Sequence, residues 1–323
     1  MNSLSEVAEV IKKARRPLIS GHVMPDGDSL GSILALGLGL QTLGQEVTMV
    51  SSDPVPDLYT FLPGAEQIVV GKVPPGNYDL FIALDCSVID RLGKYVESVL
   101  NSEITTLVID HHVNDNPFGH YNYVEPKSAA TGQIVMDLLD LINIEIDNKL
   151  AINLYTAIVT DTGSFRYENT TPEVHVKASR LIDLGIPVSK LSNLIFGEQP
   201  VESIRLLQVA LQSLEISKCG QIAWLSITQE QVQSVGAEDQ HVDGLINYPR
   251  KIKGVEVAIV FKELNDGMVK VSLRSKYQVD VNLLAKKFGG GGHVRASGCT
   301  LKGGLDQAKK LVLTETQNLF RGC

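Results

Sequence analysis

The stretch GHVMPDGDSLGS, residues 21–32, places three candidate metal ligands between two apolar segments. They are His22, Asp26 and Asp28, one imidazole and two carboxylates within seven residues. Such side chains bind divalent cations when a fold brings them together with further ligands. The stretch therefore raises the question of where the remaining ligands of a metal site would come from.

Further acids and histidines follow other apolar segments in the first half of the chain. YDLFIAL ends at Asp85, TTLVI ends at Asp110, His111 and His112, and the helical pattern NLYTAIVT ends at Asp161. Ligand crevices of open α/β sheets lie beyond the carboxyl ends of the strands. We therefore expect these side chains to meet the first motif in one crevice.

The predicted ligand set carries four carboxylates and two neutral imidazoles, for a charge of −4 that two divalent cations would balance. Without metal, the carboxylates would repel each other and raise one another's pKa. The mixed set suits manganese better than magnesium, and zinc, iron or cobalt also fit. Two metals about 4 Å apart polarise a bridging water and clamp a phosphoryl group for in-line attack. The predicted chemistry is phosphoester hydrolysis by two bound metal ions. Their predicted ligands are His22, Asp26, Asp28, Asp85, His111 and Asp161.

Each residue alone also has an ordinary structural explanation. Asp28 could simply cap the next helix. Single acids after strands, such as Asp85 or Asp53 in SSD, are usually turn residues, and we interpret Asp53 in that way. The combination favours a site, because three of the seven histidines fall in these motifs.

The elements that must position these residues alternate between strand and helix. Strand patterns at 16–20, 46–50, 78–85 and 105–110 alternate with helical patterns at 29–44, 128–142, 148–161 and 170–185. The last helix carries a capping-box pattern from Thr170 to Glu173, with Pro172 in its first turn. This alternation predicts an α/β fold with a mainly parallel sheet and helices on both faces.

The pattern changes in the second half of the chain. We predict a catalytic metal-binding domain at 1–187, a helical linker at 188–213 and a second, smaller α/β substrate-binding domain at 214–323. Strand patterns at 254–263 and 267–275 are joined by Asn265-Asp266-Gly267, a strong hairpin signal.

The second half contains a glycine run, FGGGGHVRASG at 288–298. Consecutive glycines let the backbone approach an anion and point several N–H groups at it. A flexible loop before an edge strand is the alternative, and composition does not decide between the two. The predicted substrate-binding residues are Gly289, Gly290, Gly291, Gly292, His293, Arg295 and, near a strand end, Arg274, whose guanidinium can bind a phosphate or stack on a base.

Bulk composition excludes several classes of protein. A net charge of −8 argues against coating duplex nucleic acid. The N-terminus lacks the apolar run of a signal peptide, and no stretch approaches the ~20 apolar residues of a membrane span. The four cysteines form no CxxC pair, which argues against a disulfide framework or zinc knuckle and makes the cytoplasm the expected compartment.

The ordered motifs resemble a known family. His-x-x-x-Asp-x-Asp, an isolated strand-end Asp, Asp-His-His and Thr-Asp-Thr-Gly, in this order, resemble the DHH phosphoesterase superfamily. The stretch FGGGGHVRASG resembles the DHH-associated domain found in one of its branches. A two-domain chain of this length is most similar to the NrnA-like group of oligoribonucleases (nanoRNases) and 3′-phosphoadenosine-5′-phosphate (pAp) phosphatases.

This resemblance implies a manganese-dependent hydrolase of short oligoribonucleotides (nanoRNA) that yields mononucleotides, with pAp hydrolysis to AMP as a further activity. The partners it implies are short single-stranded RNA or small nucleotides, and the oligomeric state stays open, a homodimer included. It further implies that one metal is bound by His22, Asp26 and Asp85, and the other by Asp28, Asp85, His111 and Asp161.

The resemblance also implies roles around these ligands. Asp110 would orient His111 from behind, and His112 would face the substrate phosphate as a charge stabiliser or proton donor. The chain departs from many relatives at Val88, where they carry an acid, while Arg91 is retained.

Several alternatives remain at this point. A cyclic or linear dinucleotide phosphodiesterase, of the c-di-AMP or pApA type, would use the same metal site. A family II pyrophosphatase would want a lysine- and arginine-rich second domain, and a RecJ-type exonuclease would carry an added nucleic-acid-binding domain. A non-catalytic RNA- or nucleotide-binding module would usually have lost one or more aspartates. In the favoured reading the first domain does the chemistry, the second binds the far end of the nucleotide, and the cleft between them sets substrate length.

Overall fold

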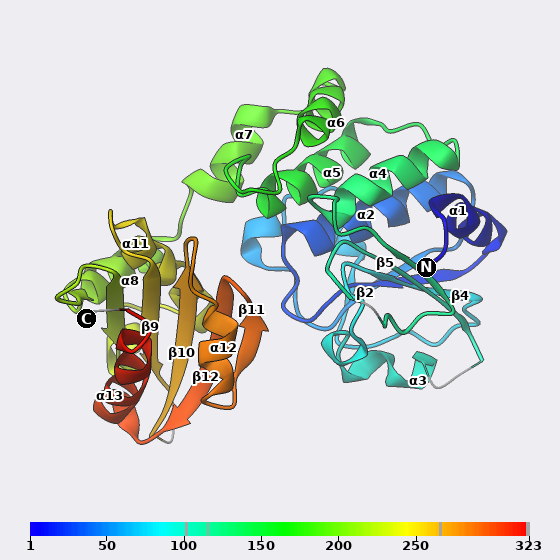
Figure 1. Ribbon diagram of the computed structural model, residues 1–323. Coiled ribbons are helices and arrows are strands. Elements are labelled where there is room, and N and C mark those ends of the chain that lie inside the picture. Colours follow the sequence, from blue (N-terminus) through cyan, green and yellow to red (C-terminus); the bar gives the residue numbers. More distant parts are fainter. Residues whose placement is uncertain (101–102, 115, 265–266, 321–323) are drawn as a thin grey trace. The chain divides into compact units, whose positions relative to one another are not determined.

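The computed structural model describes residues 1–100, 103–114, 116–264 and 267–320, without the side chains at 98, 240, 243 and 293. The chain divides into two compact units, Met1–Glu198 and Gln199–Cys323, each built on a six-stranded sheet of described residues (Figure 1). The division falls inside the segment 188–213 that the sequence analysis expects to be a helical linker. The helix α7 (Val188–Ser192) and the π-helix η5 (Asn193–Gly197) precede the division, and α8 (Val201–Leu211) follows it.

The sheet of the first unit is parallel throughout, as predicted, in the order β3-β2-β1-β4-β5-β6. From β1 the chain moves outward to β2 and β3 and then returns to β4 on the other side of β1. This reversal creates a topological switch point between β1 and β4, where open α/β sheets bind ligands. The strands are β1 (Pro17–Ser20), β2 (Thr48–Ser51), β3 (Val69–Val70), β4 (Leu80–Leu84), β5 (Thr105–Asp110) and β6 (Tyr121–Val124).

Successive residues of the central strands pack into different cores, because side chains alternate across a sheet. Ile19 and Ile82 are register partners in the larger core, and Leu18 and Phe81 are partners in the smaller one on the opposite face. The larger core lies under helices α1 (Leu4–Lys13), α2 (Gly27–Thr42), α4 (Thr131–Leu141) and α5 (Asn148–Asp161), with α6 (Pro172–Asp183) packed on α5 (Figure 1).

The smaller core is covered by short elements. They are the α-helix α3 (Glu97–Leu100) and the 3₁₀ helices η3 (Ile89–Arg91) and η4 (Lys94–Val96). Two further 3₁₀ helices, η1 (Asp57–Tyr59) and η2 (Ala65–Gln67), lie between β2 and β3, and α7 (Val188–Ser192) and η5 (Asn193–Gly197) end the unit.

Glycines allow α2 to approach its neighbours closely. A Cβ on Gly31 would lie 2.4 Å from the carbonyl oxygen of Asn153 on α5, and one on Gly132 would lie 2.4 Å from Cβ of Ala157. Only glycine fits such contacts without moving backbone. This close packing fixes α2, α4 and α5 against each other, and their ends carry residues of the predicted site.

The cap of α6 differs from the prediction by one residue. Thr171, not Thr170, is the N-cap, and its hydroxyl accepts a hydrogen bond from the Val174 N–H at 3.3 Å. Pro172 therefore occupies the first helical position, where its missing N–H and fixed φ are best tolerated.

The second unit has a mixed sheet in the order β11-β12-β10-β9-β8-β7, in which only the β8–β9 pair is parallel among the described pairings. The expected hairpin residues Asn265 and Asp266 lie outside the described residues. The two strands that flank them, β9 and β10, do pair antiparallel. The strands are β7 (Glu215–Ile216), β8 (Ile222–Ile227), β9 (Val257–Glu263), β10 (Met268–Ser275), β11 (Gly291–His293) and β12 (Ala296–Lys302).

Helices cover both faces of this second sheet over two separate cores. One core lies with α12 (Val281–Lys286) and α13 (Gly304–Gln317). The other lies with α8 (Val201–Leu211), α9 (Gln229–Ser234), α10 (Asp239–Asp243), η6 (Gly244–Ile246) and α11 (Asn247–Lys251).

Helix length and the state of the cysteines bear on two expectations drawn from the composition. In the portion of the chain that is described, no helix is both long and apolar enough to span a bilayer. Cys86 and Cys299 are buried free thiols.

Candidate metal centre

The structure brings together all six residues that the sequence analysis predicts as metal ligands. They lie at the carboxyl edge of the parallel sheet, around the switch point between β1 and β4. Their ligand atoms fall into overlapping groups, each with all atoms within 4.8 Å of one another: His22–Asp26–Asp85, Asp28–His111–Asp161 and Asp85–His111–His112. Such groups can hold metal ions.

Asp85 stands between the two halves of this cluster. Its Oδ2 lies 3.3 Å from Nε2 of His22, and its Oδ1 lies 3.6 Å from Nε2 of His111. Its backbone is left-handed, with φ of 56°, and its N–H donates to the Ile109 carbonyl at 3.0 Å. A left-handed non-glycine residue is strained, and such strain concentrates at functional sites. The unusual backbone places a buried carboxylate where both histidines can face it.

Asp28 is held by the N-terminus of α4. Its two carboxylate oxygens accept hydrogen bonds from the N–H groups of Thr131, at 2.7 Å, and Gly132, at 2.8 Å, and Ser32 Oγ lies 3.2 Å away. The Thr131 hydroxyl also donates to Asp85 Oδ1 at 3.1 Å. Free N–H groups and the helix dipole make a helix N-terminus favourable for a carboxylate. One helix end therefore positions two acids of the cluster.

His111 has a buried ring nitrogen without a hydrogen-bond partner. Its Nε2 lies 3.2 Å from Asp161 Oδ2 and 3.7 Å from Asp28 Oδ2, but it forms a hydrogen bond with neither. Its Nδ1 lies 3.1 Å from the Ser128 carbonyl oxygen. Donation from Nδ1 to a carbonyl leaves the Nε2 lone pair pointing at the acids, which is the tautomer of a metal-binding histidine.

His22 repeats this arrangement. Its Nδ1 lies 2.8 Å from the Val23 carbonyl oxygen, and its Nε2 faces Asp85 and Asp26. Burial alone would lower the pKa of His22, but hydrogen bonding to Asp26 and Asp85 raises it to about 10. In the absence of a metal, a proton on His22 supplies positive charge between these acids.

The carboxylates of the cluster are hard to ionise together. Burial, followed by the charges of Asp85 and Asp26, raises the pKa of Asp161 to about 8. Burial and the charges of Asp85 and Asp161 raise the pKa of Asp28 well above its ordinary value. Bound cations would offset the repulsion between these acids and would give the unpartnered imidazole nitrogen a partner. The donor set therefore fits divalent metal ions.

Asp110 holds His112 rather than His111. Its Oδ1 lies 2.8 Å from Nδ1 of His112 and accepts the N–H groups of His111 and His112 at 2.7 and 3.0 Å. The expectation that Asp110 orients the ring of His111 is wrong, because its short side chain folds over the next two N–H groups and reaches the ring two residues on. Ser128 takes that role instead.

This pair has a clear electrostatic signature. The hydrogen bond to Asp110 raises the pKa of His112 to about 8. Burial opposes ionisation of Asp110, yet its hydrogen bond and attraction to His112 lower its pKa to about 2. The pair is therefore an aspartate and an imidazolium at neutral pH, with the His112 side chain about a third exposed beside the buried acids.

Some residues of the site were missed in the sequence. Thr131, Gly132 and Ser128 contact the predicted ligands through hydrogen bonds that no spacing motif reveals, although AATG at 129–132 is typical of a helix start. Asp53, interpreted as a turn residue, also accepts the N–H of Met24 at 2.7 Å and so fixes the loop between His22 and Asp26.

The glycine run of the second unit is not one continuous loop. Gly289 follows α12 with φ of 72°, and Gly291 and Gly292 form edge strand β11, paired with Gly298 and Ser297. A Cβ on Gly290 would lie 2.1 Å from the Gly298 carbonyl oxygen. Both sequence interpretations thus missed that half of the run is itself an edge strand.

The charged residues predicted beside this run have different surroundings. Arg295 donates from Nη1 to the Val279 carbonyl at 2.9 Å and from Nη2 to the Tyr277 carbonyl, so its guanidinium already holds the loop after β10. Arg274 lies near the end of β10, as predicted, and donates to the Leu273 carbonyl at 3.0 Å. His293 lies in β11, and its side chain is outside the described part.

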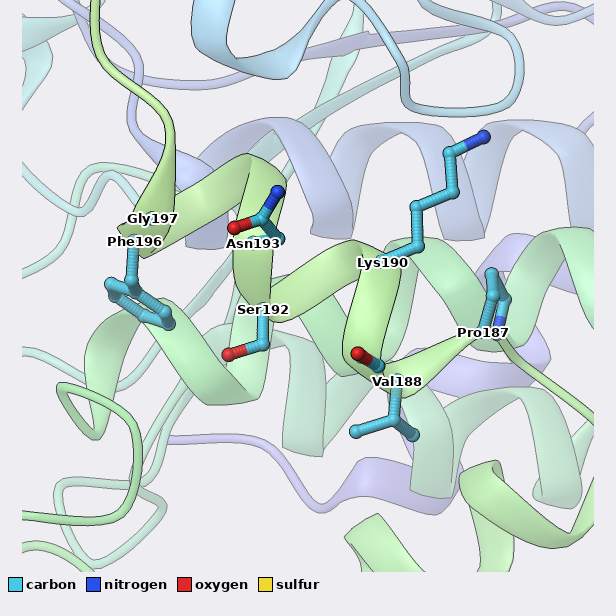
Figure 2. Close-up of a pocket in the computed structure, with 8 residues that line it drawn as sticks. Pro187, Val188, Lys190, Ser192, Asn193, Phe196 and Gly197 are labelled. Atoms are coloured by element: carbon cyan, nitrogen blue, oxygen red, sulfur yellow. The ribbon is translucent and has the colours of Figure 1, made fainter.

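One pocket of about 1160 Å³ lies elsewhere in the first unit. Its lining residues run from Pro187 to Gly197, a single segment comprising α7 and η5 (Figure 2). It contains none of the predicted site residues and no group of acids or histidines. The predicted site residues therefore lie at the strand ends and not in this pocket.

Comparison with known proteins gives consistent matches. Residues 16–158 match the N-terminal domain of the DHH family, and residues 226–319 match the DHHA1 domain. The chain is 40% identical over 315 residues to a Thermus thermophilus protein named bifunctional oligoribonuclease and PAP phosphatase NrnA, covering 95% of this chain and 91% of that protein. It is 26% identical over 288 residues to a Bacillus subtilis protein of the same name, covering 88% of each.

Two further matches bear on structure and substrate. The chain is 26% identical in sequence to an exopolyphosphatase-related protein from Bacteroides fragilis, whose crystal structure superposes on it with a TM-score of 0.92. The match covers 98% of this chain and 96% of that one. A Listeria monocytogenes protein named cyclic-di-AMP phosphodiesterase PdeA is 24% identical over 333 residues, covering 97% of this chain but 49% of that protein.

Proposed function

Because the chain belongs to the DHH phosphoesterase family, a family of metal-dependent hydrolases of phosphoester bonds, we propose that it cleaves short oligoribonucleotides to mononucleotides and pAp to AMP, using two manganese ions. The observation that carries this proposal is the buried Nε2 of His111, which has no hydrogen-bond partner and faces Asp28, Asp85 and Asp161. The substrate class comes from the names of the relatives in Thermus and Bacillus.

The proposed metal ligands divide into two sets that share Asp85. One ion would be held by His22, Asp26 and Asp85, and the other by Asp28, Asp85, His111 and Asp161. Support comes from the three overlapping groups of ligand atoms and from the raised pKa of Asp161 and Asp28. When bound, such ions polarise a water molecule and neutralise a phosphoryl group.

His112 is the protein's own group for the substrate phosphate in this proposal. It is an imidazolium at neutral pH, because Asp110 accepts its Nδ1–H, and its ring remains partly exposed beside Asp85. Its Nε2–H can hydrogen-bond a phosphate oxygen or pass a proton to the leaving oxygen. Asp110 acts through His112, as a positioning residue.

The second unit would bind the part of the nucleotide away from the metals. The proposed contacts are Arg274, the backbone of Gly289–Gly292 and His293, since Arg274 lies near the end of β10 and the run leads into β11. Arg295 is reassigned from direct contact to support, because its guanidinium donates to two backbone carbonyls of the loop after β10. An acidic chain with a few such contacts suits a short substrate better than a long one.

One experiment tests this function. The protein is incubated with manganese and, separately, with the linear dinucleotide pApA, a longer RNA, pAp and a cyclic dinucleotide, and the kcat/KM values are compared. The proposal expects pApA to be the best substrate, pAp to be cleaved, and a chelator to abolish turnover. Release of no AMP from pApA or pAp with any divalent ion would overturn it.

A cyclic or linear dinucleotide phosphodiesterase is the second candidate, favoured by the similarity to the Listeria protein. The same comparison decides between them, because a preference for the cyclic dinucleotide, or cleavage of pApA without cleavage of pAp, would favour this candidate. A non-catalytic binder is disfavoured by the complete set of acids and histidines at the strand ends.

A further inference from the structure

Four large exposed apolar side chains belong to segments that also carry the predicted metal ligands or His112. Met24 is 75% exposed, Val88 and Ile89 are each 47% exposed, and Val113 is 82% exposed. They lie on the segments that follow β1, β4 and β5, three neighbouring strands of the sheet, with Ile89 at the start of η3. We call Met24, Val88, Ile89 and Val113 the apolar rim.

Exposed apolar side chains scattered singly over a protein surface are ordinary. The apolar rim differs because every member is within four residues of a predicted ligand or of His112 along the chain. The loops all leave the carboxyl edge of the parallel sheet, which is the edge that binds ligands in open α/β folds. A group of exposed apolar side chains at a binding edge indicates a contact surface for something apolar.

The loops that carry the apolar rim are held by hydrogen bonds between them. The Val23 N–H donates to the Arg91 carbonyl at 2.7 Å, which joins the loops after β1 and β4. The Asn114 amide donates to the Ser87 carbonyl at 2.8 Å and to Ser87 Oγ at 3.1 Å, which joins the loops after β5 and β4. The three loops that carry the apolar rim are therefore tied to one another and are not independent segments.

Met24 is the most constrained member of the apolar rim. Its backbone is left-handed, with φ of 52°, and its N–H is bound by Asp53 Oδ2 at 2.7 Å. This conformation is unfavourable for a non-glycine residue and persists only where surrounding contacts enforce it. The loop thus holds a flexible apolar side chain in solvent in an unfavourable backbone conformation, two residues from His22 and two from Asp26.

We propose that the apolar rim is a platform for a nucleobase of the substrate, beside the phosphate at the metal centre. This inference rests on the proposed function, which puts a phosphate at the acids and histidines. A nucleotide has an apolar planar base attached to its charged phosphate by one sugar, so it needs an apolar surface next to a charged site. Aliphatic and thioether side chains contact the face of any base, so the platform favours nucleotides over small phosphoesters without selecting a base.

The test compares polar substitutions on two matched substrates. One is pApA, and the other is its abasic analogue with the same sugar-phosphate backbone and no bases. Met24→Asn tests the most constrained position, since asparagine tolerates left-handed backbone, and Val113→Asn tests the most exposed. Val176→Asn is the control, because Val176 is 69% exposed on α6, outside the apolar rim. Met24→Leu is the conservative variant.

We expect Met24→Asn and Val113→Asn each to lower kcat/KM on pApA roughly 10-fold, the size of one lost apolar contact. Turnover of the abasic analogue, bound manganese, and both activities of Val176→Asn should be unchanged, and Met24→Leu should retain most of the activity on pApA. An equal loss on both substrates would show that these loops only hold the metal ligands. No loss on either substrate would also overturn the platform.

A binding measurement separates this inference from the proposed function. The affinities of AMP and ribose 5-phosphate for the manganese-loaded protein are compared by calorimetry. The platform predicts tighter binding of AMP, and that this preference falls in Met24→Asn, even if no substrate is turned over. No AMP preference in the unmodified protein would overturn the platform. Weaker self-association of Met24→Asn in sedimentation, with AMP preference intact, would assign the apolar rim to contact between copies of the chain instead.

Discussion

The Nδ1 atom of His112 lies 2.8 Å from Oδ1 of Asp110, whereas the ring of its neighbour His111 turns to the Ser128 carbonyl on one side and to three acids on the other. Two adjacent histidines therefore have different partners and different expected roles. One is held as an imidazolium, and the other has a lone pair directed at a cation site.

This difference predicts a separation of metal binding from turnover. His111→Ala should lose bound metal as well as activity, because it removes a ligand. His112→Ala should retain metal but lose rate by ~100-fold or more, as expected for a charge stabiliser or proton donor. Metal content measured after gel filtration, beside kcat, tests this, and equal metal loss in the two variants would contradict the assignment.

Asp110→Asn should change the pH dependence of the reaction. Asp110 raises the pKa of His112 to about 8, so the imidazolium is present below that pH and is lost as the pH rises through it. Without the carboxylate the pKa of His112 falls, and the alkaline decline of kcat/KM should begin at lower pH. The measurement is a pH profile on pApA at saturating manganese. Unchanged midpoints would show that His112 does not govern that limb.

Metal should stabilise the folded protein through its buried acids. Ions that bind only the folded state raise stability by about 2.7 kcal/mol at a concentration 100 times their Kd. We expect manganese to raise the Tm and to bind at close to two equivalents, and Asp85→Asn to reduce both effects, since Asp85 faces both halves of the cluster. Asp57→Asn, on η1 outside these groups, is a suitable control. A single equivalent in the unmodified protein would refute the two-ion arrangement.

The second unit should matter for dinucleotides and not for minimal esters. Arg274→Ala and His293→Ala should lower kcat/KM on pApA while leaving metal content unchanged. A remote contact positions the scissile phosphate only when the substrate reaches it. A minimal phosphodiester should therefore be much less affected. If both variants treated the two substrates alike, the second unit would not bind substrate.

The residues of the strand ends could be predicted because a parallel sheet gathers its carboxyl ends at one edge. His22, Asp85 and His111 each follow a strand whose apolar pattern is evident in the sequence. Their orientation could not be predicted in the same way. The left-handed backbone of Asp85 depends on contacts made after folding, and local sequence does not require it.

The partners of the predicted residues were the least predictable part. Ser128 contacts His111 from 17 positions away, and Arg295 uses its guanidinium on carbonyls 16 and 18 positions back. A spacing motif identifies which side chains can bind an ion or an anion. It does not show which of them another part of the chain has already engaged, as the guanidinium of Arg295 is.

The hydrogen bonds from the first turn of α4 to Asp28 have a consequence for how the chain can change over generations. Thr131 and Gly132 lie 103 and 104 positions after Asp28, yet they hold its carboxylate directly. The position of the Asp28 carboxylate therefore depends on the position of this distant helix start. A substitution that shifts the first turn of α4 should therefore disturb Asp28, so suppressors of a damaged Asp28 loop should map to the beginning of α4.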